Sequence, residues 1–154
     1  MRARRLGFCS VSRSHWRLRL HRQTRKPTAQ EVAVIRNCAA QYTDNVDEGE
    51  RQCVSCTKRP EAASTFGTAD CYRVEWVIWD NLLNENFKNL MGPLDEQQNA
   101  KLKAMQHAWI AYRDTTCNFY MDEIQGTMAQ PMGAACATRE TARRVLPLRF
   151  FERL

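Results

Sequence analysis

The chain of 154 residues is long enough for one folded domain and a tail, and its net charge of +6 is unevenly distributed. Nine of the 23 basic residues fall in residues 1–30, which contain no acid, so 14 basic and 17 acidic residues leave residues 31–154 at about −3. This balance argues against a nucleic-acid-binding folded part, which would need a basic stripe. No apolar run reaches the roughly 18 residues that a transmembrane helix needs.

Residues 1–30 are rich in Arg and Ser and have almost no apolar periodicity, so the sequence predicts a basic, disordered tail. Such a tail suits contact with phosphates or anionic lipids. A cysteine-containing helix and loop extension is expected over residues 31–68, followed by a helical domain over residues 69–154.

The first predicted helix begins near Thr28. Three apolar residues share one of its faces, namely Val32, Ile35 and Ala39. Residues 42–67 are rich in Asp, Glu, Thr, Ser, Gly and Pro and lack a sustained hydrophobic period, so we expect a loop with short helical turns there.

A long helix is predicted next, capped by Thr68 or Asp70 and running to about Met91. Apolar residues at spacings of three and four form its expected buried stripe: Trp76, Trp79, Leu83, Phe87 and Leu90. Gly92 and Pro93 end it, because glycine suits a C-terminal cap and proline cannot continue a helix.

A second long helix is predicted from about Asp95 to Ile124. Its expected apolar stripe consists of Leu102, Met105, Trp109 and Tyr112. Gly126 breaks this helix, and Thr127 is suited to cap the third.

The third helix carries its expected apolar face on Met132, Ala135, Ala142 and Leu146. Pro131 falls near its first turn, where proline is tolerated, and Pro147 is expected to kink or end it. Since no segment reads as a strand, the predicted fold class is all-α, a small helical bundle built on an antiparallel helical hairpin and stapled by disulfides.

Two cysteines flank the predicted hairpin turn at similar distances. Cys117 lies nine residues before Gly126 and Cys136 lies ten residues after it. Residues equidistant from such a turn face each other, at the Cα separation of roughly 5.5–6 Å that a disulfide needs. The spacing therefore predicts a Cys117–Cys136 disulfide.

Four further cysteines precede the hairpin. Cys38–Cys53 and Cys56–Cys71 is the simplest of their three possible pairings, and each bond would add about 3 kcal/mol on the chain-entropy model. A different interpretation is a four-thiolate zinc site built around the Cys53-x-x-Cys56 motif. With the basic tail, that reading describes a structural zinc-binding module that contacts nucleic acid or lipid.

The string from Gln106 to Cys117, QHAWIAYRDTTC, closely resembles the Q-x-x-W-x-x-Y-R-D-x-x-C signature of the LprI-like lysozyme-inhibitor family of bacterial envelope proteins. The matching signature positions are Gln106, Trp109, Tyr112, Arg113, Asp114 and Cys117. Flanking positions agree in order and spacing: Cys71, Glu75, Asp80, Leu83 and Asn84 before the signature, and Cys136, Thr141, Arg144 and Leu148 after it. The resemblance covers roughly residues 56–150.

The resemblance implies an exported periplasmic or extracellular protein that inhibits lysozyme or binds another envelope protein, without a cofactor. It transfers no inhibitory residue, because the matching positions resemble scaffold. We expect Arg113 and Arg144 to be partly buried cations paired with Glu75, Asp80 or Glu140.

The chain also departs from the family pattern. Gln125 and Gly126 replace the usual double glycine at the hairpin, and Cys38 and Cys53 are additional to the usual four cysteines. The Arg-rich start replaces the usual signal peptide. We interpret residues 1–30 as a misplaced start or frame, the true export signal being lost from this version; an organelle-targeting presequence, which is also rich in Arg and Ser and poor in acids, is the alternative.

An enzyme is not expected. Two of the three histidines lie in the tail, and His107 has no evident nucleophile partner. For a binding protein, an acidic stretch is the best local candidate for long-range attraction to basic lysozymes: Asp44, Asp47, Glu48 and Glu50.

Overall fold

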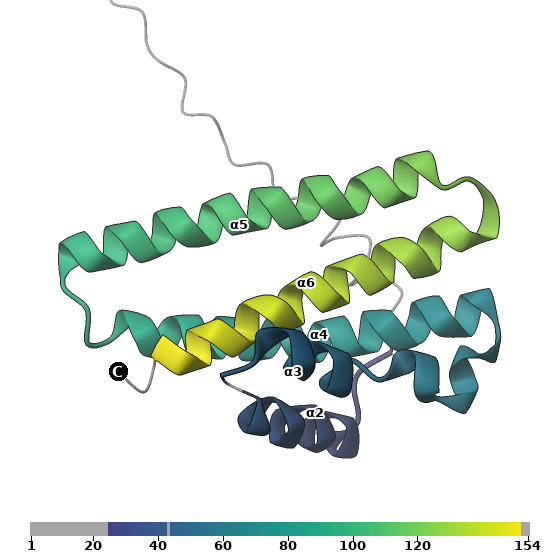
Figure 1. The fold of residues 1–154 in the computed structure, drawn as a ribbon, viewed down its shortest axis with the longest axis horizontal. Coiled ribbons are helices and arrows are strands. Elements are labelled where there is room, and N and C mark those ends of the chain that lie inside the picture. The colour runs from purple at the N-terminus through teal and green to yellow at the C-terminus, as the bar shows by residue number, and fades with distance from the viewer. Residues whose placement is uncertain (1–24, 43, 152–154) are drawn as a thin grey trace, which may run out of the picture.

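The computed structural model describes residues 25–42 and 44–151 (Figure 1). Five α-helices occur in these ranges: α2 (Ala29–Gln41), α3 (Val46–Cys53), α4 (Thr65–Met91), α5 (Glu96–Glu123) and α6 (Ala129–Phe151). Short 3-10 helices join them, namely η1 (Cys56–Lys58), η2 (Pro60–Ala63) and η3 (Gly126–Met128). The described ranges contain no strand, which confirms the all-α prediction. Residues 1–24 of the predicted tail lie outside them.

Local capping signals explain where two of the helices begin. Thr28 and Glu31 form a reciprocal capping box at the start of α2, and Asp95 and Gln98 form another at the start of α5. Each box satisfies backbone N–H groups that a helix start leaves without partners. Both starts agree with the sequence prediction.

Other boundaries differ from those predicted. Ser64 caps α4, because its Oγ accepts from the N–H of Gly67 at 3.0 Å, and Thr68 lies inside the helix with its hydroxyl donating to backbone carbonyls. The segment expected to be loop contains the eight-residue helix α3. Thr127 lies in η3 instead of capping α6, and α6 continues through Pro147 to Phe151.

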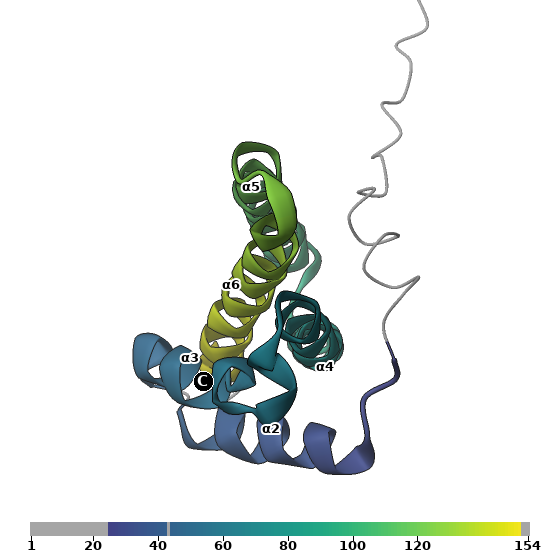
Figure 2. The same cartoon turned by 90° about the vertical axis from the view of Figure 1, so that its right-hand side faces the viewer.

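Helix α6 is the centre of the arrangement. It packs against α4 on one side and α5 on another, while α3 also lies against it and α2 packs on α3 and α4 (Figures 1 and 2). Helices α5 and α6 are joined through η3 and pack on each other, which is consistent with the antiparallel hairpin expected from the sequence (Figure 1). No helix within the described residues combines the length and the apolar composition needed to cross a lipid bilayer.

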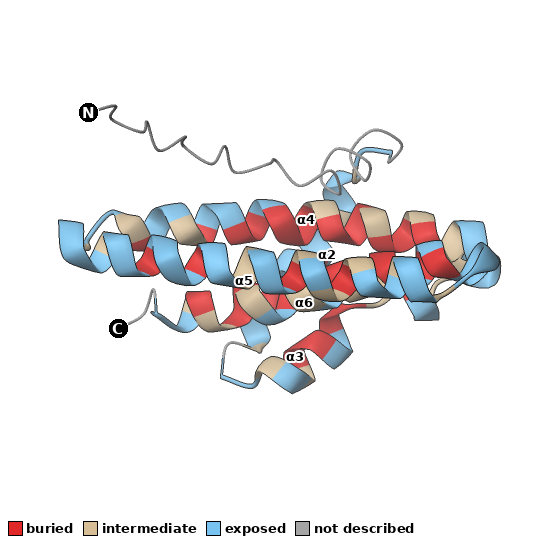
Figure 3. Ribbon diagram, turned by 90° about the horizontal axis from the view of Figure 1, so that it is seen from above, coloured by how far each residue is buried: buried red, intermediate tan, exposed pale blue. Residues whose placement is uncertain are grey.

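Most of the hydrophobic core lies between α4 and α6. Its largest fully buried apolar side chains are Ile35, Trp76, Ile78, Trp79, Leu82, Leu83, Leu146 and Leu148. Figure 3 shows the resulting band of buried residues along α4, whereas α5 presents mostly exposed residues to the viewer. The core therefore anchors α4 and α6, and α5 lies on its border.

The apolar stripe predicted for α5 is only partly correct. Its buried positions are Leu102, Gln106, Arg113 and Cys117. Trp109 is half-buried, but Met105 and Tyr112 are 39 % and 54 % exposed. Two polar side chains thus face inward and two large apolar ones face outward, because the inner face of α5 contains an Arg–Trp stack and a disulfide in place of an aliphatic contact.

Candidate functional site

The hairpin of α5 and α6 is joined covalently below its turn. Cys117 and Cys136 form a disulfide with a Cα separation of 5.5 Å, the pair predicted from their distances to Gly126. Trp76 of α4 and Ala137 pack against the bond in a small buried cluster. Gly126 has a φ of +80°, a conformation that favours glycine, and it starts the turn between the two helices.

A buried cation occupies the inner face of α5. Arg113 is 2 % exposed and donates to the Asp114 carboxylate through Nε at 2.9 Å and Nη2 at 2.7 Å. Its guanidinium carbon lies 4.8 Å from the centroid of the Trp109 ring. The acid paired with this cation is therefore its sequence neighbour, which was not among the partners expected for it.

A second arginine approaches the same ring from α6. The guanidinium carbon of Arg144 lies 5.8 Å from the centroid of Trp109, and its Nε donates to Gln106 Oε1 at 3.1 Å. Burial lowers the pKa of Arg144. Nη1 of Arg113 and Nη2 of Arg144 are buried without a hydrogen-bond partner among the described residues. The π-face of Trp109 adds a favourable contact for both cations.

The remaining family positions are distributed over α4, α5 and α6. Asn84 donates to the backbone oxygen of Asp80 at 2.8 Å and to its carboxylate at 3.2 Å. Thr141 is fully buried and donates to the Ala137 carbonyl, and Leu83 is in the core. Tyr112 differs from these positions, because its side chain is exposed. That these positions serve as scaffold stays a prediction.

The other two disulfides hold the N-terminal part of the described chain. Cys38 pairs with Cys53 and Cys56 pairs with Cys71, the simplest of the pairings considered from the sequence. The same four cysteines were the ligands of the alternative zinc reading. With their sulfurs bonded to one another, they offer no thiolate set for a four-cysteine site.

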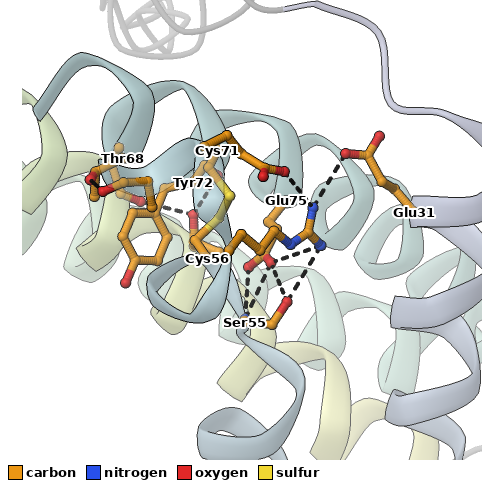
Figure 4. The surroundings of a disulfide bond; sticks show 12 residues. Glu31, Ser55, Cys56, Thr68, Cys71, Tyr72 and Glu75 are labelled. Atoms are coloured by element: carbon orange, nitrogen blue, oxygen red, sulfur yellow. Dashed lines mark hydrogen bonds and ion pairs between the residues drawn. A yellow bond between two sulfur atoms is a disulfide. The ribbon is translucent and has the colours of Figure 1, made fainter. Parts of the chain in front are cut away.

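A buried carboxylate lies beside the Cys56–Cys71 bond, as Figure 4 shows. Glu75 is fully buried and accepts from Ser55 through N–H at 3.2 Å and through Oγ at 2.9 Å. Nη2 of Arg59 lies 3.3 Å from its Oε1. Burial is the largest effect and raises the pKa of Glu75, although Ser55 and Arg59 act in the opposite direction.

Arg59 also reaches the start of α2, where its Nη1 lies 3.3 Å from Glu31 Oε1. The side-chain hydrogen bond from Arg25 is the largest cause that lowers the pKa of Glu31 to about 2, and Thr28 adds to the effect. Arg59 therefore links the Glu75 carboxylate, beside the Cys56–Cys71 disulfide, with the capping residue Glu31 of α2. These groups form a structural network at the junction of η1, α2 and α4.

The acidic stretch singled out from the sequence is partly neutralised in the fold. Asp47 and Glu50 lie 3.3 Å and 3.6 Å from Nη2 of Arg143, and Arg139 Nε lies 3.3 Å from Glu50. These ion pairs dock α3 on α6, so two of the four acids have a structural role. A role of this stretch in attracting a basic partner stays a prediction.

The free end of the hairpin carries exposed apolar side chains that were not recognised from the sequence as a surface. Tyr120, Met128 and Met132 are 40 %, 48 % and 38 % exposed, and Asp122 is exposed beside them in the chain. We call these four residues the hairpin tip. The one available sequence signal is charge: residues 114–138 contain three acids and no Lys, Arg or His.

The tip rests on a fixed base. The Cys117–Cys136 bond joins its two helices, and Nη2 of Arg73 on α4 donates to Gln130 Oε1 at 2.5 Å. A small apolar and acidic projection on a covalently fixed support is suited to protein recognition, because little conformational entropy is lost when it binds.

The family of the chain follows from comparison with known proteins. The family model described as lysozyme inhibitor LprI matches residues 56–148, which include all of α4 and α5 and most of α6. Comparisons with curated proteins and with solved structures gave no significant match. The match extends over more than half of the sequence and contains two of the three disulfides, so the chain belongs to the lysozyme inhibitor LprI family.

Proposed function

We propose that this protein is an exported inhibitor that binds a lysozyme or a related muramidase and blocks its cleft by protein–protein contact. Support comes from membership of the lysozyme inhibitor LprI family, which favours a binding protein over an enzyme. The hairpin tip is our candidate for the inserted element, since an inhibitor of this kind must present a projecting surface.

The observation that carries this assignment is the exposure of Tyr120 and Met128 on a disulfide-fixed support. Aromatic and methionine side chains gain most when a partner surface excludes water from them. The charged residues of segment 114–138 are all acidic. Many lysozymes are basic, so complementary charge would speed the association of the two proteins.

Export is the compartment that we propose from the cysteine chemistry. Three disulfides join six cysteines of a small helical protein, and such bonds persist in oxidising compartments such as the periplasm or the extracellular space. Non-reducing mass mapping of freshly isolated native protein should find all three bonds. Six free thiols in that material would contradict export.

The function is tested by adding the oxidised full chain to a basic muramidase that is digesting bacterial cell walls. We expect a concentration-dependent loss of lysis that weakens as salt is raised, because salt screens the attraction between exposed charges. The double variant Tyr120→Ala/Met128→Ala should inhibit at least about tenfold more weakly. Asp122→Lys should reduce the inhibition most at low salt.

Matched controls remove exposed apolar side chains elsewhere. Val34 on α2 and Phe66 on α4 are 52 % and 78 % exposed, and their alanine variants should inhibit like the parent protein. Full lysis at a large molar excess over a panel of muramidases would defeat the inhibitor function. Parent-like inhibition by the tip variants would instead defeat only the assignment of the tip.

A further inference from the structure

The outer face of α5 carries a second exposed surface, distinct from the hairpin tip. Met105, Tyr112 and Phe119 follow one another at intervals of seven residues and are 39 %, 54 % and 63 % exposed. Ala108 and Thr115, which are also exposed, fall between them. The resulting alternation of three and four residues is the spacing by which one helix packs along another. We call these five residues the α5 seam.

A hollow lies beside the N-terminal end of this seam. It has a volume of about 780 Å³ and is formed where the end of α4, the following loop, the start of α5 and the end of α6 meet. Its lining is mostly apolar and consists of Asn89, Leu90, Pro93, Leu94, Leu102, Met105 and Phe151. Met105 belongs to both features, so the apolar surface continues from the seam into the hollow.

The seam is self-complementary about Tyr112. Met105 lies seven residues before Tyr112, beside the hollow, and Phe119 lies seven residues after it as a projecting ring. Exposed charges follow the same symmetry, with Lys101 eleven residues before Tyr112 and Glu123 eleven residues after it. Each seven-residue step spans about 10 Å of helix. One end of the seam therefore has a hollow and a positive charge, and the other end has a projecting ring and a negative charge.

We propose that the α5 seam binds a second copy of this chain, with the two α5 helices antiparallel and a two-fold axis near Tyr112. Phe119 of each copy then enters the hollow beside Met105 of the other, and Lys101 faces Glu123. A two-fold interface uses the same patch on both subunits, which is the requirement that this arrangement of knob, hollow and charges meets.

A parallel arrangement of the two α5 helices would not bring complementary groups together. It would place Lys101 against Lys101 and Phe119 against Phe119, and each hollow would face another hollow. The hairpin tip contains none of the seam residues, so each surface can be changed without altering a residue of the other. The two surfaces are open to separate tests.

The test is the mass of the oxidised full chain by sedimentation velocity or light-scattering chromatography across a range of concentrations. We expect a monomer–dimer equilibrium. Phe119→Asp should raise the dissociation constant at least about tenfold, whereas Phe66→Asp, which changes an exposed ring on α4, should leave it unchanged. Far-UV circular dichroism and the intact mass verify that both variants are folded and oxidised.

Charge exchange then tests the antiparallel direction. Lys101→Glu and Glu123→Lys should each weaken the dimer, and the double variant Lys101→Glu/Glu123→Lys should restore it. A chain that stays monomeric at millimolar concentration would overturn the proposal, and a double variant no better than the single ones would overturn the antiparallel arrangement. Loss of muramidase inhibition by Phe119→Asp without any change of mass would assign the seam to a different partner.

Discussion

Arg113 lies over the ring of Trp109, with 4.8 Å between the guanidinium carbon and the ring centroid. The two residues stand one helical turn apart on α5, and Arg144 of α6 approaches the same ring. A tryptophan face is the best aromatic partner for a cation, and the interaction strengthens when water is excluded. Packing of α5 on α6 thus depends on an electrostatic stack as well as on apolar contact.

Replacement of Arg113 is therefore expected to destabilise the fold. Arg113→Ala leaves the partly buried Asp114 without its partner, and breaking a buried ion pair in this way costs about 3 kcal/mol. For a chain of this size the melting temperature should fall by about 6–12 °C. Arg51→Ala is the control, because that side chain is 66 % exposed and its pair with Glu48 contributes little. An equal melting temperature for the Arg113 variant and the parent would contradict the structural role.

Glu31 should make stability fall in acid. Because the hydrogen bond from Arg25 lowers the pKa of Glu31 to about 2, its stabilising effect is complete above the unfolded-state pKa near 4.5 and is lost as pH falls toward 2. Glu31→Gln should thus lower the melting temperature at neutral pH, with a deficit that disappears between pH 4.5 and 2. Glu96→Gln, in the first turn of α5, is the matched control and should show no such deficit. A deficit that is the same at every pH would exclude the charge as its cause.

Glu75 should make the protein less stable as pH rises, which is the opposite of the effect of Glu31. Burial raises the pKa of Glu75, so its contribution to stability is complete below about pH 4.5 and is lost as pH rises through the raised folded-state pKa. Glu75→Gln keeps an acceptor for Ser55 and removes the buried charge. We expect the variant to melt higher than the parent at pH 7, with a difference that shrinks toward pH 4.5. A variant that melts lower than the parent at pH 7, with a deficit that shrinks in acid, would mean that the ion pair with Arg59 outweighs the cost of burying the charge.

Gly49 is needed for the contact of α3 with α6. A Cβ at this position would lie 2.6 Å from Leu146 Cδ1 and 2.7 Å from Tyr42 Cβ. Gly49→Ala should therefore lower the free energy of unfolding by about 1–3 kcal/mol in a denaturant titration. Gly92→Ala is the matched change, since the nearest atom to its Cβ is 3.4 Å away, and it should leave stability unchanged or slightly raised. Equal stability of the two variants would contradict close packing at Gly49.

Local signals were enough to predict much of this fold. The caps at Thr28 and Asp95 depend only on residues within one helical turn, and both are found in the structure. The Cys117–Cys136 pair follows from the position of the turn alone. These features need no knowledge of which helix packs against which, so a single sequence suffices for them.

Features that depend on tertiary packing were not predictable in the same way. Helix α3 has eight residues, too few to be stable alone, and it is held by the ion pairs of Arg139 and Arg143 and by its contact at Gly49. Hydrophobicity likewise placed Met105 and Tyr112 of α5 inward, whereas both are exposed. The expected burial of Arg113 is found, but its pairing with the neighbouring Asp114 was not predicted, because the choice of partner depends on how the side chains pack.

The Cys117–Cys136 bond also determines what happens if a protease cuts the turn at Gly126. The bond closes a loop with a sequence separation of 19, so both products of that cut remain one covalent molecule. Each severed helix end stays close to its neighbour at a high effective concentration, which keeps the two helices paired. A nicked hairpin would separate only after reduction, and loss of the paired helices would then report the redox state of the surroundings as well as the cleavage itself.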